Sequence, residues 1–214
     1  MHKQLQRDAQ YAKQADSLTI ESRIAVTRPT SFSVGRASVD PVGFFQVLDL
    51  APMNSAIDTQ VDGIFGSGIL NGIFYAIDFG NRTLRLGRPK HPTELPFKIE
   101  FEGQRPLVSA TVNGAKVEFV LDTGAMYTSI SHDTAARLLN ESSIEDAVRY
   151  LSLSVDGLRP AKLRRATIDR LEFAGIDFEN FTVFIGDHDL IGLDILRNGV
   201  LTVDASAGRY SFRY

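Results

Sequence analysis

Two stretches of the sequence follow one pattern at a constant spacing, and this repeat constrains the fold more than any other feature. Residues 64–86 match residues 190–212 without a gap, at an offset of 126. Identical residues at matched positions are Gly66 and Gly192, Ile69 and Ile195, Leu70 and Leu196, and Asp78 and Asp204. Strands look alike, so apolar matches arise by chance, but chance rarely aligns the same glycines and aspartates in one register. The chain is therefore predicted to hold two copies of one structural unit.

The two copies are not equally complete. A long segment with a candidate strand, helix and hairpin precedes the second copy, whereas the first copy follows a polar stretch, residues 1–31. The proline-bearing stretch from Arg88 to Pro96 is a natural linker. We therefore predict a frayed arm or one amphipathic helix over 1–31, half of a lobe over 32–90, a linker over 91–98 and a complete domain over 99–214.

Composition narrows the function classes. The chain has 214 residues and is 43% hydrophobic, which is enough for a sizeable core. It has no cysteine, so disulfides, thiolate zinc sites and cysteine nucleophiles are excluded. The four histidines are far apart in sequence and no H-x-x-x-H spacing occurs, so we expect no metal site and no cofactor. A net charge of -3 gives no general attraction to nucleic acid.

Short apolar runs separated by turn residues predict an all-β fold. From Phe32 onward, β-type runs alternate with Gly, Pro, Asn and Asp. The clearest runs cover residues 44–48, 73–79, 107–112 and 117–121. Two short helices are expected among the strands. One follows Ser131, and the other starts near Ser143, which has capping-box spacing to Asp146. Without a partner, the half-lobe would expose sheet edges, so we expect it to associate.

A chemical motif follows one of these runs. Val117 to Leu121 reads as an apolar strand that leads directly into Asp122-Thr123-Gly124. An aspartate at this place could simply cap a turn, which is a common role. Two further features accompany the motif: Ala125 and Thr128 follow it closely, and an apolar-apolar-Gly run lies farther on, at Leu190-Ile191-Gly192.

On these residues the sequence resembles the aspartic proteases, and most closely their retropepsin-like branch. The resemblance covers about residues 99–214, and the run from Leu190 to Leu196 is similar to the LGxDxL pattern of bacterial and retroelement members. It implies a closed acid-protease β-barrel with one or two short helices, and the half-copy adds a partial second lobe. Asp194 and Asp204 are then structural rather than catalytic residues, and the repetition of Asp204 as Asp78 favours that reading.

The residue types suit peptide hydrolysis. Two carboxylates about 3 Å apart cannot both ionise, so they share one proton, and together they can activate water and polarise the carbonyl. Aspartic proteases are the best-known example of such a dyad, and its pKa values belong to the pair rather than to either residue. Gly124 lets the backbone pass close to the carboxylate of Asp122. By the resemblance, Thr123 bonds to the partner loop, and Ala125, Thr128, Ile191 and Gly192 support the active-site loop.

The sequence shows one such aspartate, and a single carboxylate cannot perform this chemistry. The resemblance implies that a homodimer supplies the second, with residues 209–214 as a candidate interface strand. The alternative is an N-terminal lobe upstream of Met1 that carries its own aspartate. The half-copy at 32–86 keeps both readings open.

A hairpin after the helices is the candidate flap over the substrate. Residues 151–155 alternate as a strand does, and Asp156-Gly157 is a strong hairpin-turn signal. We predict that Val155, Asp156, Gly157 and Leu158 form the flap tip and contact the substrate. The alternative is a surface hairpin that does not contact the substrate.

We therefore expect an aspartic endopeptidase that acts on peptides or proteins. The alternative is a non-catalytic, protease-like module that binds a peptide or a partner protein. No stretch reaches the ~18 apolar residues of a membrane span, and the N-terminus has no apolar signal segment. The expected location is cytoplasmic if Met1 is the native start.

Overall fold

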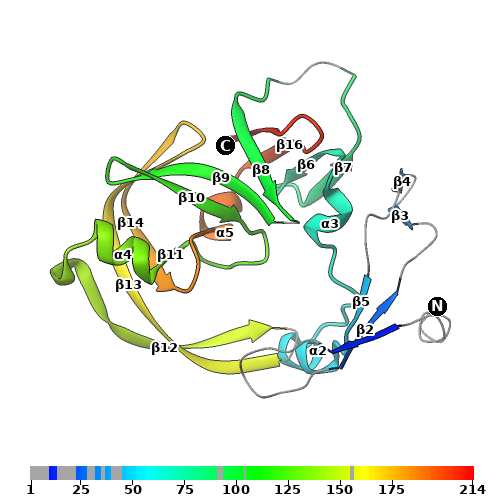
Figure 1. The fold of residues 1–214 in the computed structure, drawn as a ribbon, viewed down its shortest axis with the longest axis horizontal. Helices are drawn as coiled ribbons and strands as arrows, with labels where there is room; N and C mark the ends of the chain where they lie inside the picture. Colours follow the sequence, from blue (N-terminus) through cyan, green and yellow to red (C-terminus); the bar gives the residue numbers. More distant parts are fainter. Residues whose placement is uncertain are drawn as a thin grey trace. The chain divides into compact units, whose positions relative to one another are not determined.

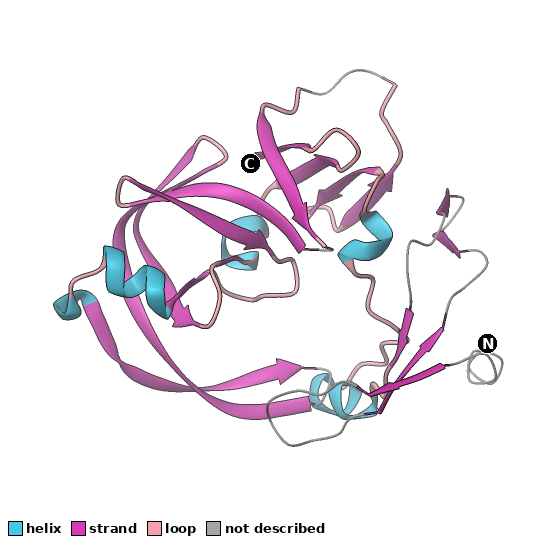
Figure 2. Cartoon of the chain, viewed as in Figure 1, coloured by secondary structure: helices cyan, strands magenta, loops and turns pink. Residues whose placement is uncertain are grey.

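Strands dominate the fold, as Figure 2 shows. The computed structural model describes residues 10–13, 23–27, 32–34, 37–39, 45–90, 94–103, 105–154 and 157–214. The chain divides into two compact units. One comprises residues 1–69 with 151–160, and the other comprises residues 70–150 with 161–214. The prediction of an all-β fold with short helices is confirmed.

The first unit is built from short strands. β1 (Gln10–Lys13), β2 (Arg23–Thr27) and β5 (Phe45–Val47) form a three-stranded antiparallel sheet. β3 (Phe32–Val34) pairs with β4 (Ala37–Val39). Helix α2 (Ala51–Ile57) follows, with a proline in its first turn. Paired strands within residues 1–31 replace the single amphipathic helix that was one of the two expectations for that stretch.

The second unit contains a closed β-barrel. Its strands are β9 (Arg105–Val112), β10 (Ala115–Leu121), β11 (Ser129–Ser131), β13 (Gly157–Phe173), β14 (Ile176–Gly186) and β15 (Leu190–Ile191). The pairing runs β9-β10-β15-β11-β14-β13 and returns from β13 to β9, which closes the ring. Alternate side chains of β9 and β10 point into the core, as closure requires. Phe119, Ile168 and Phe173 are among those fully buried there.

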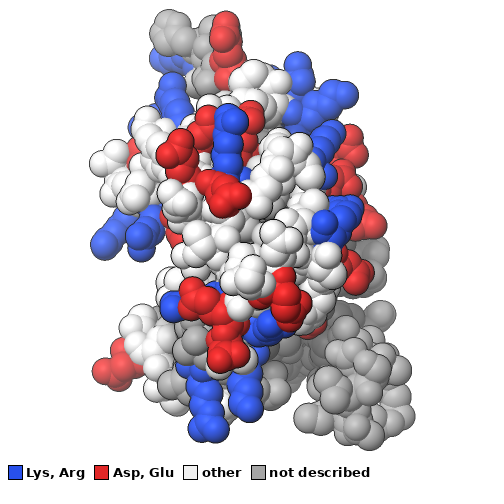
Figure 3. All heavy atoms as spheres, turned by 90° about the vertical axis from the view of Figure 1, so that its left-hand side faces the viewer, with Lys and Arg blue, Asp and Glu red and all other residues white. Residues whose placement is uncertain are grey.

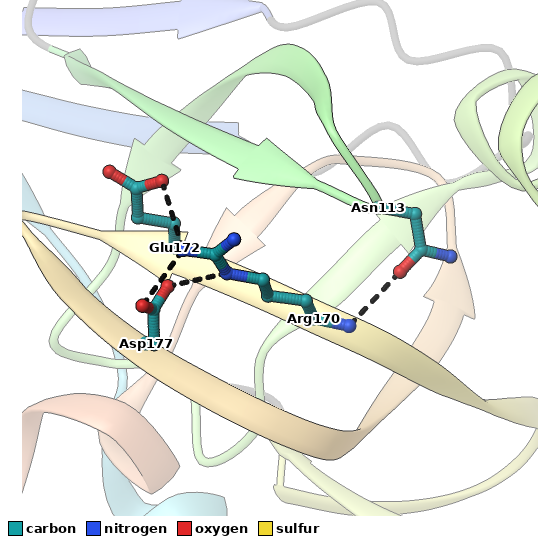
Figure 4. Close-up of polar contacts among 4 residues, drawn as sticks. All are labelled: Asn113, Arg170, Glu172 and Asp177. Carbon is teal, nitrogen blue, oxygen red and sulfur yellow. Dashed lines mark hydrogen bonds and ion pairs between the residues drawn. The ribbon is translucent and has the colours of Figure 1, made fainter.

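A polar contact holds the β9–β10 turn against β13 (Figure 4). The main-chain N–H of Asn113 donates to the carbonyl of Arg170 at 2.9 Å, and the Asn113 side-chain oxygen accepts from the Arg170 N–H at 3.1 Å. The Arg170 guanidinium in turn forms an exposed ion pair with Asp177 on β14, at 2.7 Å. The two Asn113 bonds extend the β9–β13 pairing that closes the ring of strands. The exposed ion pair adds little stability.

One of the two predicted helices is present. α4 (His132–Leu138) begins after Ser131, whose hydroxyl accepts the N–H of Thr134 at 3.1 Å. The prediction of a second helix from Ser143 is wrong. The Ser143 hydroxyl donates backward to the carbonyl of Asn140 at 2.7 Å, within a short 3-10 turn (Glu141–Ser143), and the following residues form β12 (Ile144–Ser154). Pairing with the neighbouring strand β13 overrides the local capping signal.

The sequence repeat is a repeat of structure. Helix α3 (Ser67–Leu70) corresponds to α5 (Leu193–Leu196), and β6 (Phe74–Asp78) corresponds to β16 (Val200–Asp204). β7 (Thr83–Leu86) likewise corresponds to β17 (Arg209–Arg213). These elements share the offset of 126 that the sequences share. The two stretches therefore share the same order of helix and two strands.

The two copies meet in one sheet. Its order is β8 (Phe97–Glu102), β17, β16, β6, β7, and the antiparallel strands β6 and β16 lie side by side (Figure 1). In this pairing Ala76 lies opposite Thr202, which is its own counterpart in the repeat. The flanking bonds are counterparts as well: Phe79 N–H donates to Gly199 at 3.1 Å, and Ala205 N–H donates to Ile73 at 3.2 Å. The copies are thus related by a local two-fold axis through the Ala76–Thr202 pair, which we call the internal dyad.

Candidate functional site

Asp122 lies immediately after the barrel strand β10, half-buried at the start of a tight loop. Its main-chain N–H donates to the carbonyl of Ile191 at 3.0 Å. Its carboxylate oxygen Oδ1 accepts the N–H of Gly124 at 2.8 Å. Because this bond uses a backbone donor, the orientation of the carboxylate is set by the loop itself.

Backbone hydrogen bonds join this loop to the second part of the motif. β10 runs parallel to β15, with Leu121 opposite Ile191. The N–H of Leu193 donates to the carbonyl of Ala125 at 2.8 Å, and the N–H of Asp194 donates to that of Met126 at 3.2 Å. The structure therefore brings together the two sequence segments that carried the resemblance.

Gly192 is the point of closest approach between these segments. A Cβ at this position would lie 2.6 Å from the carbonyl carbon of Tyr127 and 2.9 Å from the nitrogen of Thr128. These are backbone atoms, so they cannot move aside as a side chain could. Any side chain at Gly192 would push the loop of Asp122 out of place.

A buried polar contact fixes the end of the loop. Thr128 is fully buried, and its hydroxyl donates to Oδ1 of Asp194 at 2.7 Å while accepting the N–H of Gly192 at 3.1 Å. The Thr128 N–H also donates to the Asp194 carboxylate at 2.9 Å. Asp194 is therefore structural, as expected, but its direct bond to Thr128 was not foreseen. The only sequence signal for this contact is the position of Asp194, two residues after Gly192.

The outer side of the loop is open. Thr123 is exposed, and the side chains of Met126 and Tyr127 are 65% and 49% exposed. The Tyr127 ring packs against Phe184 of β14, with 4.7 Å between the ring centroids. The exposed side chains of the loop are therefore Thr123, Met126 and Tyr127, and they are accessible to a substrate or a partner loop that binds at Asp122.

The aspartates of the repeat have equivalent places at two hairpin turns. Asp78 Oδ1 accepts the N–H of Asn81 at 2.9 Å, and Asp204 Oδ1 accepts the N–H of the matching residue, Ala207, at 3.1 Å. Asp204 is also ion-paired with Arg88 at 2.6 Å. Burial raises the pKa of Asp204, but the hydrogen bonds from Ser206 and Ala207 and the charge of Arg88 outweigh it, so the pKa is lowered overall.

The predicted flap is described only in part. β12 and β13 are neighbouring strands that flank the expected turn, and Gly157 and Leu158 begin β13. Val155 and Asp156 lie outside the described residues. The flap role of these four residues stays a prediction.

Among the described residues, no group of three or more His, Asp or Glu side chains is placed to hold a metal ion. On the face drawn in Figure 3, the basic and acidic side chains are intermixed. No helix within the described ranges is both long and apolar enough to span a membrane.

Comparison with known proteins agrees with this geometry. Residues 108–205 match the family model of aspartyl proteases, a range that contains Asp122, Thr128, Gly192 and Asp194. The predicted resemblance to aspartic proteases, with their acid-protease fold, is thereby confirmed for this part of the chain. None of the curated proteins matches the chain.

Two similar solved structures are proteases. A retropepsin-like aspartic protease from Rickettsia conorii is 19% identical, with a TM-score of 0.40, and the match covers 59% of this chain and 100% of that one. The EIAV protease, solved with an inhibitor, is 18% identical with a TM-score of 0.36, and the match covers 46% of this chain and 91% of that one.

Proposed function

We propose that Asp122 is one of two catalytic carboxylates of an aspartic endopeptidase. The observation that carries the proposal is the loop of residues 122–128, which is clamped onto Gly192 by hydrogen bonds and by a contact that only glycine permits. The aspartyl protease family match spans both segments. A loop held this firmly can keep a carboxylate in one position during catalysis.

The proposed reaction is hydrolysis of a peptide bond by an activated water. The ionised carboxylate takes a proton from water as the water oxygen attacks the carbonyl carbon. The protonated carboxyl of the pair donates a hydrogen bond to the carbonyl oxygen as negative charge develops there. The tetrahedral intermediate then collapses and the C–N bond breaks. The leaving nitrogen takes the proton that the first carboxylate removed from water, which yields a carboxylic acid and an amine and returns the carboxylate pair to its starting protonation state.

The second carboxylate has to come from another lobe. The chain contains one Asp-Thr-Gly and no Asp-Ser-Gly. Thr123 is exposed beside Asp122, so it is free to bond to a matching loop and hold the two carboxylates together. We further propose that the β12–β13 hairpin, with Val155, Asp156, Gly157 and Leu158 at its tip, covers the bound peptide.

Cleavage of an unfolded protein at acidic pH tests the proposal. The chain is assayed alone, over a range of concentrations, and also joined by a flexible linker to an upstream copy of residues 94–189, which supplies a second Asp-Thr-Gly. We expect the joined form to cleave and Asp122→Asn in the full chain to abolish that cleavage. If neither form cleaves while circular dichroism shows both folded, the protein is instead a protease-like module that binds peptides.

A further inference from the structure

The internal dyad makes the two copies comparable strand by strand. Among the described strands, β7 of the first copy has no counterpart of β8 beside it. In the second copy, β17 pairs with β16 on one edge and with β8 on the other, where Arg209 faces Lys98 and Tyr210 faces Phe97. In the first copy, β7 pairs with β6 on the matching edge. Within the described part of the chain, β7 is the last strand of the sheet.

The side chains on the two edges differ as this pairing predicts. Tyr210 is 1% exposed and its ring lies 5.5 Å from that of Phe97 on β8. Leu84 has the same position in the first copy and is 41% exposed. An open edge with an apolar side chain is a template for an added strand.

The motif before the hairpin shows the same contrast. Gly192 touches the loop of Asp122, whereas no described atom lies within 4 Å of a Cβ built on Gly66, its counterpart. Ile64, the counterpart of Leu190, is 60% exposed. In the second copy the corresponding segment lies beside an Asp-Thr-Gly loop, to which it is hydrogen-bonded.

We propose that the open edge of β7 binds a protease half-lobe that carries its own Asp-Thr-Gly or Asp-Ser-Gly loop. The half-lobe contributes a β8-like strand whose residues face Thr83 and Leu84, the counterparts of Arg209 and Tyr210. An apolar residue, as Phe97 is, faces Leu84. The docking itself does not depend on catalysis. Only the role of the half-lobe's aspartate rests on the proposed function, in which it forms the catalytic pair with Asp122.

A second copy of this chain is a poor occupant. Its β8 is already paired with its own β17 and β9, and its Asp122 loop already rests on its own Gly192. To pair with β7 of another chain, β8 would have to leave β17 of its own chain. The exchange would therefore gain no strand pairing. The strand predicted as a dimer interface, residues 209–214, lies inside the sheet between β16 and β8. The same sheet thus favours a half-lobe over a homodimer.

Disulfide trapping tests this edge without any need for catalysis. The chain has no cysteine, so the only thiols present are those introduced at chosen positions. The full chain with Asp122→Asn and Thr83→Cys is mixed with a synthetic peptide of residues 94–103 that carries Lys98→Cys. We expect the mixed disulfide to form about tenfold faster than with the matched control Arg85→Cys, because only Thr83 lies opposite Lys98 in the proposed register.

A reference and a second readout make the outcome decisive. The full chain with Lys98→Cys and Arg209→Cys closes the same residue pair internally and sets the reference rate. The unmodified peptide should also slow amide hydrogen exchange at Leu84 in the chain without cysteine. Equal trapping at Thr83 and Arg85 would overturn the proposal. So would faster disulfide formation between two Thr83→Cys chains than with the peptide, which would identify a second copy as the occupant. If the peptide is trapped at Thr83→Cys but the joined form does not cleave, the docking proposal stands and the proposed protease function is refuted.

Discussion

Gly66 and Gly192 have the same place in the two copies but different surroundings, and this gives a matched test at the scale of single residues. Gly192→Ala would place a methyl group within 2.6 Å of backbone, whereas Gly66→Ala meets no described atom within 4 Å. We expect Gly192→Ala to lower the free energy of unfolding by about 1–3 kcal/mol, as overpacking does, and Gly66→Ala to change it little. Urea unfolding measures both. Equal losses would mean that the close contact at Gly192 does not constrain the loop.

Sequence patterns identified some residues of the site and missed one contact. The position of Asp122 follows from a local signal, a strand that ends in a tight turn, and Gly192 from an apolar-apolar-Gly run. The bond between Thr128 and Asp194 joins residues that are 66 positions apart. Hydrophobic periodicity reports which face a residue occupies but not which distant residue it meets, so this contact required the fold.

The hairpin turns give a prediction for pH dependence at the scale of elements. The carboxylate of Asp204, with a side chain 5% exposed, holds the β16–β17 turn and has a lowered pKa. A carboxyl with a lowered pKa in the folded state stabilises the protein above its unfolded pKa of about 3.9, and this contribution is lost as pH falls through the folded value. Asp204→Asn should therefore cost about 1–3 kcal/mol at neutral pH and progressively less in acid.

Unfolding midpoints in urea, measured from neutral to acidic pH, would show the two curves converging. Asp78→Asn is the matched control, because Asp78 holds the equivalent turn in a more exposed position and has a lowered pKa caused first by the Asn81 side chain. Its change with pH should be smaller. A constant gap between the protein and Asp204→Asn across this range would refute the role of the charged carboxylate.

Element types were predicted best where pattern and tertiary pairing agree. The strands predicted near 73–79, 107–112 and 117–121 are present as β6, β9 and β10. The predicted helix after Ser143 failed because residues 144–154 are a strand beside β13. A capping signal reports a local preference of a few tenths to about 2 kcal/mol, which the pairing of a long strand exceeds.

At the scale of the whole molecule, the internal dyad predicts how cleavage depends on concentration. If a second copy supplied the other aspartate, cleavage per chain would rise with protein concentration and then saturate. Because the β6–β16 contact already occupies the dyad within one chain, we expect the chain alone to gain no cleavage per molecule on concentration. The joined form should cleave at a rate per molecule that does not depend on concentration. Initial rates over a wide dilution series distinguish the two cases.

The sequence predicts the repeat, but it does not predict how the two copies pair with each other. Matching residues indicate two copies, since one glycine and one aspartate recur in the same register together with an Ile-Leu pair. The pairing of β6 with β16 depends on backbone hydrogen bonds between distant segments, which side-chain patterns do not encode. The sequence therefore predicts a half-lobe with open edges. Among the described strands, the outer edge of β17 is paired with β8 and the outer edge of β7 is unpaired.

The same β6–β16 pairing also bears on how the chain folds. These strands come from distant parts of the sequence, and all the barrel strands from β9 to β14 lie between them. Hairpins such as β9–β10 and β13–β14 close short loops, whereas joining β6 to β16 closes a very long one, which costs more entropy and slows that step. We therefore expect the barrel to form first and the seam between the copies to form last. Until the seam forms, the edge of β16 that pairs with β6 is unpaired. We therefore expect newly made chains to be most prone to aggregation at that stage.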